Sequence, residues 1–192
     1  EKRVDSDIMN EKGYGGISIT EEAVQRVPQV RPDGWSAEQA ERLQEAHRDL
    51  LLKVKDSPVG TEAGAVYSPD LRLIERKVGD AAAQQIVMPR CQKPHIFIHN
   101  HPSGKIFSHT DIVPFAMNEN MQAITAVGNT GNVYMLVKTD AYDGFWFLQA
   151  YNAVLKQLMD AINESNIGKY MAVMEEFLEG VEAYGAQFIK RG

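Results

Sequence analysis

The sequence lacks the features that define several classes of protein. It contains a single cysteine, Cys91, in 192 residues, so it cannot form an internal disulfide and does not require an oxidising compartment. No apolar run approaches the roughly 18 residues of a membrane span, and the N-terminus has no apolar signal-peptide core. We therefore expect a cytoplasmic protein without membrane contact.

An excess of positive charge is also missing. Lys and Arg number 20 against 26 Asp and Glu, which gives a formal net charge of −6. Because an acidic average field repels phosphate backbones, nucleic acid is a disfavoured partner. The length suits one globular domain of ordinary size. The start at Glu1 instead of Met suggests a processed product or a piece of a longer protein.

Glycine and proline are frequent in the N-terminal part, and hydrophobic periodicity begins after it. Residues 1–35 are predicted to form an arm or linker with one short helical turn over 20–26. Ser36 and Gln39 form a capping-box pattern ahead of apolar residues at three-to-four spacing, which predicts an amphipathic helix over 36–55.

The middle of the chain alternates strand and helix patterns. Runs of β-prone residues are separated by turns rich in Gly, Pro, Asn and Asp, as expected for hairpins and short buried strands. The predicted elements are a hairpin over 61–78, a short helix over 80–87, a buried strand over 95–99, a helix over 111–121 and a hairpin over 124–137.

After residue 143 the apolar pattern becomes helical. One stripe runs from Phe145 to Ile162, and a second, with alternating four and three spacing, runs from Tyr170 to Phe188. We expect a C-terminal helical pair over 143–192 that packs on the core or on a partner, including a second copy in a homodimer. The predicted fold class is mixed α/β, with a central sheet and a core domain over 36–142.

Histidine is concentrated in one place. Four of the five histidines fall between residues 95 and 109. Alternate residues of a strand point to the same side, so His99 and His101 can direct two imidazoles at one point while Asn100 faces away. Asp111, near the start of the next helix, can bring a carboxylate there. Two His and one Asp leave the fourth position of a tetrahedral zinc open, as in catalytic sites; these ligand types also suit iron or manganese.

These residues carry a family resemblance. His-Asn-His-Pro-Ser-Gly at 99–104 and Ser-His-Thr-Asp at 108–111 resemble the His-x-His-Pro…Ser-x-x-Asp signature of the JAMM (MPN+, JAB-domain) zinc metallopeptidases. The His-Asn-His-Pro-Ser-Gly motif most resembles that of prokaryotic members, including RadC-type proteins and JAB domains linked to phage and mobile elements. The resemblance spans roughly residues 36–140 and implies a JAB/MPN-type, cytidine-deaminase-like sheet. One departure is that six residues separate His101 from Ser108, one fewer than in eukaryotic members.

The resemblance also implies a role for each site residue. His99, His101 and Asp111 would bind one zinc ion. Glu62, which follows the first predicted helix, would hydrogen-bond the metal-bound water, and Ser108 would donate to the developing oxyanion. The physical logic is general, because zinc lowers the pKa of its water to about 7 and a nearby carboxylate can pass the proton to the leaving amine.

Simpler explanations exist for some of these residues. Asp111 is a residue type common at helix N-caps, and Ser108 can serve as a cap without any part in chemistry. Glu75 is the rival of Glu62 for the catalytic carboxylate, and either could be a solvated strand-edge residue. His95 and His109 are expected to be hydrogen-bonded or exposed histidines outside the metal site.

The sequence therefore predicts a zinc-dependent hydrolase of amide or isopeptide bonds in a protein or peptide. The family that it resembles includes enzymes that remove ubiquitin or ubiquitin-like tags. The alternative is a RadC-like or phage-associated accessory factor, which keeps the metal site but works by binding or assembly. An open cleft beside an unpaired edge strand would favour the peptidase, whereas a cleft covered by residues 1–35 would favour autoinhibition or a structural role.

Overall fold

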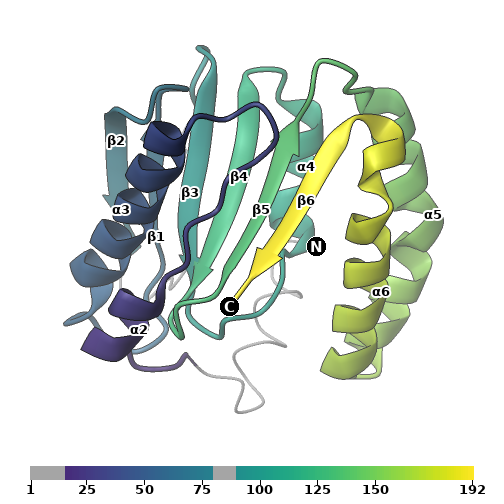
Figure 1. Ribbon diagram of the computed structural model, residues 1–192. Helices are drawn as coiled ribbons and strands as arrows, with labels where there is room; N and C mark the ends of the chain where they lie inside the picture. Colours follow the sequence, from purple (N-terminus) through teal and green to yellow (C-terminus); the bar gives the residue numbers. More distant parts are fainter. Residues whose placement is uncertain (1–15, 80–89) are drawn as a thin grey trace.

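A six-stranded mixed sheet separates two layers of helices (Figure 1). The computed structural model describes residues 16–79 and 90–192. The strand order is β2-β1-β3-β4-β5-β6; β3 and β4 are parallel, and the other neighbours are antiparallel. The strands are β1 (Ala63–Tyr67), β2 (Leu73–Val78), β3 (His95–His101), β4 (Met121–Gly128), β5 (Val133–Lys138) and β6 (Ala186–Arg191). The mixed α/β class with a central sheet flanked by helices is confirmed.

Two helices from the described N-terminal part of the chain cover one face of the sheet. They are α2 (Glu21–Arg26) and α3 (Ala37–Val54). The predicted capping box starts α3, because Gln39 N donates to Ser36 Oγ at 3.1 Å and Ser36 N donates to Gln39 Oε1 at 2.9 Å. Apolar residues at three-to-four spacing then face the sheet and are buried.

The N-terminal segment 16–35, expected as an arm or linker, belongs to the same layer. It contains the predicted short helix, α2. Thr20 caps the start of this helix, because its side-chain oxygen accepts a hydrogen bond from Ala23 N at 3.0 Å. Four of its apolar residues are buried together with α3: Ile19, Val24, Val27 and Val30. Sparse apolar residues are enough to dock a segment when the sheet and α3 supply the rest of the apolar surface.

Three helices cover the other face: α4 (His109–Met117), α5 (Gly144–Asn163) and α6 (Ile167–Glu179). Figure 1 shows α4 behind the sheet and α5 beside α6 next to β6. Aromatic rings fill the space between them, as in the edge-to-face contact of Phe115 with Phe147 at 5.9 Å between centroids. The predicted helix over 111–121 is shorter than expected, because Asn118 leaves helical geometry and β4 begins at Met121.

The C-terminal helical prediction is wrong beyond Glu179. A 3₁₀ turn (Val181–Tyr184) follows α6, and the chain then forms the edge strand β6. Gly185 reverses the chain with a left-handed φ of 74°, a conformation that glycine adopts without steric cost. Phe188 consequently lies on a strand and stacks on Tyr134 of β5, with 6.4 Å between ring centroids.

Gly185 offers a test of this turn. A Cβ atom there would lie 2.2 Å from the backbone oxygen of Ala141, so we expect Gly185→Ala to lower the free energy of unfolding by about 2–4 kcal/mol. Gly34 is the matched control, since its φ is also positive (80°) but nothing lies within 4 Å of its Cβ position. Gly34→Ala should cost only about 1–2 kcal/mol. Equal losses in chemical denaturation would contradict the steric explanation.

The remaining elements agree with the sequence where they can be compared. Both predicted hairpins form, as β1 with β2 and β4 with β5. The helix predicted over 80–87 lies outside the described residues. Across the described parts of the chain, no helix combines the length and the apolar character that crossing a bilayer demands.

Candidate metal centre

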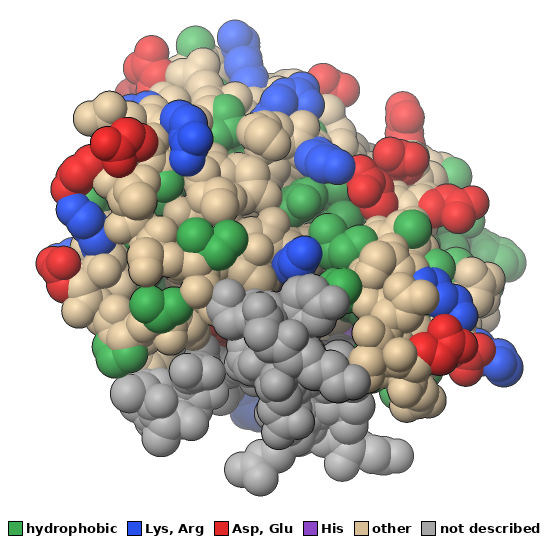
Figure 2. Space-filling model, turned by 90° about the horizontal axis from the view of Figure 1, so that it is seen from below, with side chains coloured by type: hydrophobic (Ala, Val, Ile, Leu, Met, Phe, Trp, Pro, Cys, Tyr) green, Lys and Arg blue, Asp and Glu red, His purple; other side chains and the backbone are tan. Residues whose placement is uncertain are grey.

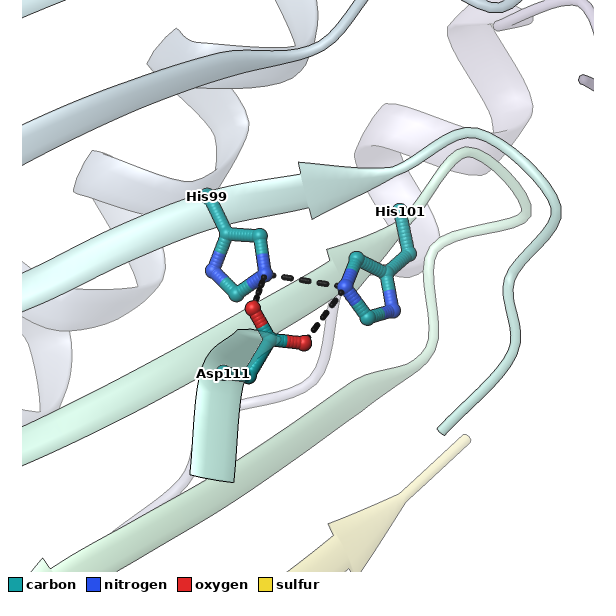
Figure 3. Close-up of side chains that lie close together, drawn as sticks. All are labelled: His99, His101 and Asp111. Carbon is teal, nitrogen blue, oxygen red and sulfur yellow. Dashed lines mark hydrogen bonds and ion pairs between the residues drawn. The ribbon is translucent and has the colours of Figure 1, made fainter. Parts of the chain in front are cut away.

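The three predicted ligands meet at the carboxyl end of β3 (Figure 3). His99 Nε2 lies 3.1 Å from Asp111 Oδ1, and His101 Nε2 lies 3.2 Å from Asp111 Oδ2. The two Nε2 atoms are 2.8 Å apart. Ligand atoms at about 2.0–2.1 Å from a tetrahedral zinc ion are separated by about 3.3 Å. The group therefore has nearly the spacing that one metal ion requires, and it could hold one.

Strand geometry explains why the two histidines converge. Side chains alternate across β3, which places His99 and His101 on the face of Phe97, while Asn100 points to the other face. The His99 ring stacks on the ring of Phe97, with centroids 5.3 Å apart. The third ligand, Asp111, lies in the first turn of α4, which begins directly after the loop that leaves β3.

The backbone fixes which nitrogen of His101 faces the site. His101 Nδ1 lies 2.7 Å from the carbonyl oxygen of Lys105. A carbonyl can only accept, so Nδ1 carries a proton. Nε2 faces the carboxylate of Asp111, and it offers a lone pair to a metal ion once its own proton is displaced. His99 differs, because its Nδ1 is buried and has no partner among the described residues; its orientation comes from ring packing.

The electrostatics of the site favour a cation. Burial alone would lower the pKa of His101, but the hydrogen bond and the charge of Asp111, assisted by the charge of Glu62, outweigh burial and raise that pKa to about 9. Burial would raise the pKa of Asp111, but the two histidines outweigh it and hold that pKa well below its usual range. Asp111 is thus an ionised carboxylate that is only 6% exposed. A buried carboxylate between imidazoles is suited to a divalent metal ion.

Glu62, the predicted catalytic carboxylate, lies beside the ligands. It directly precedes β1, where Gly64 pairs with His99, and continuing this register by two residues places Glu62 opposite His101 on the same face. The charge of Glu62 is also one of those that raise the pKa of His101. The rival Glu75 is exposed on the edge strand β2, opposite Val66. The structure thus places Glu62 near the three converging side chains and Glu75 away from them.

Ser108 contacts the acidic ligand. Its backbone N donates to Asp111 Oδ2 at 2.9 Å, and its hydroxyl donates to the same oxygen at 3.1 Å. The hydroxyl also lies 2.7 Å from Thr110 Oγ1. Asp111 accepts from the helix cap and faces the histidines at the same time, so its roles as cap partner and as ligand are compatible. The oxyanion role of Ser108 stays a prediction.

The other histidines lie outside the metal group. His95 is buried, with Nδ1 2.7 Å from the carbonyl oxygen of Lys93. His109 Nδ1 lies 2.7 Å from the hydroxyl of Tyr151, and the two rings stack. Neither belongs to the group of His99, His101 and Asp111.

Two contributions to the site were missed by sequence reasoning. The carbonyl of Lys105, which orients His101, is a backbone group and leaves no signal in the residue letters. The amide side chains of Asn100 and Asn129 form a buried hydrogen bond of 3.0 Å behind the ligands. A signal for Asn100 was present, since an inward-facing asparagine in a buried strand needs polar partners.

Comparison with known proteins assigns no family. No family model matches the chain, and neither a curated protein nor a solved structure matches it significantly. The resemblance to JAMM peptidases therefore rests on the residues of the signature.

Proposed function

We propose that this protein is a JAMM-type zinc metallopeptidase that hydrolyses an amide or isopeptide bond. The observation that carries the proposal is the convergence of one atom each from His99, His101 and Asp111 within 4.8 Å. Two imidazole nitrogens and one carboxylate oxygen suit zinc and leave a coordination position for water or substrate. A bound zinc ion supplies a water molecule with a pKa of about 7 and polarises the scissile carbonyl.

The protein's own residues supply the remaining steps. Glu62, beside His101, takes the proton of the attacking water and passes it to the nitrogen of the leaving amine. The backbone N of Ser108 holds Asp111 in place, and the hydroxyl of Ser108 turns from Asp111 to the developing oxyanion. The order of helix, Glu strand, His-x-His strand and Asp helix along the chain supports a JAB/MPN-type arrangement.

The surface supports a protein or peptide as substrate. Figure 2 views the end of the molecule at which β3 and β4 finish; among the described residues visible there, acidic and basic side chains are interspersed, with hydrophobic ones between them. A polyanion would require a basic surface instead. The edge strand β2 exposes Leu73, Ile74 and Val78, and an edge of this kind can bind an extended peptide by strand addition.

One observation favours the alternative, a RadC-like or phage-associated accessory factor. Ile17 N donates to the carbonyl oxygen of Pro102 at 2.8 Å, so the N-terminal segment is fastened to the loop that follows His101. Gly16 allows this close contact because it has no side chain; a Cβ atom at this position would lie only 2.9 Å from Pro102 Cβ. In this alternative the metal site is kept and its surroundings serve binding or assembly.

Metal analysis of the purified protein separates the possibilities. We expect one zinc ion per chain after equilibration with zinc and removal of excess metal, measured by mass spectrometry of the elements. His101→Ala should lose the ion, because two ligands remain. His109→Gln should keep it, because His109 contacts Tyr151 and not the ligands.

A library of internally quenched peptides then tests hydrolysis. Cleavage that stops on chelation and returns with zinc supports the peptidase. Stoichiometric zinc without cleavage of peptide or isopeptide probes supports the accessory factor. A wild-type protein without metal would overturn both.

A further inference from the structure

The side chain of Asn100 holds both neighbours of Glu62. It lies between the two histidine ligands in sequence but on the opposite face of β3, and it is 0% exposed. Asn100 Oδ1 accepts from Ala63 N at 2.7 Å, and Asn100 Nδ2 donates to the carbonyl oxygen of Thr61 at 3.2 Å. One side chain therefore fixes the backbone directly before and directly after Glu62.

Asn100 is itself anchored by a second buried amide. Asn100 Nδ2 donates to Asn129 Oδ1 at 3.0 Å, and the backbone N of Asn129 donates to the carbonyl oxygen of His101 at 3.2 Å. Asn129 Nδ2 donates to the carbonyl oxygen of Ile17 at 2.7 Å. A buried polar network with its groups paired in this way is rigid and resists displacement.

We infer that Asn100 is a positioning residue, which sets Glu62 at a fixed offset from His99 and His101. The ladder between β1 and β3 begins at Gly64 and His99, and the side-chain bonds of Asn100 extend it to the segment that carries Glu62. The inference rests on the proposed function, in which Glu62 transfers the proton. Displacing a reacting group by about 1 Å can slow catalysis about 100-fold.

The test compares Asn100→Ser with the wild-type protein in the full chain. Without the amide acceptor, we expect the amide hydrogen of Ala63 to exchange at least about 10-fold faster in the zinc-free protein, as measured by NMR. The kcat for the best-cleaved quenched peptide should fall about 10- to 100-fold, with KM and zinc affinity within about threefold of wild type. Asn132→Ser is the matched control, because the Asn132 amide donates to Gly104 at 2.9 Å, outside this network.

A double-mutant cycle with Glu62→Gln separates positioning from a merely structural role. If Asn100 acts through Glu62, then Asn100→Ser should lower kcat no further in the Glu62→Gln background. A parallel loss of zinc affinity and kcat, a full additional loss in that background, or unchanged exchange at Ala63 would each overturn the inference.

Further measurements distinguish failure of the positioning role of Asn100 from failure of the proposed peptidase function. Should Asn100→Ser fail to fold, Asn129→Ser removes the anchor of Asn100 together with the hydrogen bond to Ile17. It should lower kcat by a smaller factor, again only when Glu62 is present. Unchanged kcat and Ala63 exchange would contradict the inference. A wild-type protein that neither binds zinc nor cleaves peptides refutes the proposed function. In that case the exchange rate at Ala63 still decides whether Asn100 holds this segment.

Discussion

Glu62→Gln should lower kcat for peptide hydrolysis by about 10²- to 10⁴-fold, which is the usual contribution of a general base and acid. Glutamine keeps the size of the side chain and its hydrogen-bonding capacity but cannot take up a proton near neutral pH. Since Glu62 is not one of the three converging ligands, zinc content and KM should change little. Steady-state kinetics on the quenched peptide, together with metal analysis of the same samples, measure the effect.

Glu75→Gln is the matched control for this experiment. Glu75 is the same residue type on the neighbouring strand β2, but it is exposed and lies opposite Val66 instead of beside the ligands. We expect its kcat to equal that of the wild type. Full activity of the Glu62 variant would refute the proposed mechanism, and a comparable loss in both variants would show that the negative charge of these two carboxylates matters more than proton transfer by Glu62.

Asp111→Asn should weaken zinc binding by more than about 100-fold. Mutating residues that only orient zinc ligands already lowers zinc affinity by about 10- to 100-fold. Asp111 is the single anionic member of the group, so its loss should have a larger effect. The variant replaces a buried carboxylate, which faces two imidazoles, by a neutral amide of nearly the same shape. Competition with a chromophoric chelator measures the affinity, and peptide hydrolysis should fall with zinc occupancy.

Loss of a helix cap has to be separated from loss of a ligand in that variant. Asp143 provides the control, because it caps α5 by accepting from Trp146 N at 3.1 Å, and it lies outside the metal group. Asp143→Asn should leave zinc affinity unchanged and lower the free energy of unfolding by at most about 1 kcal/mol, because asparagine also caps helices. Unchanged zinc affinity in the Asp111 variant would remove Asp111 from the ligand set.

The convergence of His99, His101 and Asp111 could be predicted from the sequence because it depends on local geometry. The alternation of β3 and the capping position of Asp111 are properties of a few consecutive residues. The choice between Glu62 and Glu75 was different, since it depends on which strand pairs with β3. That pairing is a contact between distant parts of the chain, and the sequence left both carboxylates open.

The C-terminal strand shows why periodicity alone misled the prediction. Tyr184 and Phe188 are spaced by four residues, as on a helix, yet Gly185 turns the chain between them and Phe188 packs on β5. Burial of the segment 16–35 was missed for a related reason. Its few apolar residues are complemented by α3 and the sheet, and that complement is not visible within the segment itself.

Site residues that are close in sequence should come together during folding before those that are distant in sequence. His99, His101 and Asp111 lie within a 13-residue stretch, so their convergence requires only one short loop to close. The bond between Asn100 and Ala63 spans 37 residues, and forming it requires a long-range strand pairing, which is slower. During folding, affinity for the metal should therefore appear before the carboxylate of Glu62 reaches the site. Substitutions that weaken strand pairing elsewhere in the sheet should lower kcat more than they lower metal affinity.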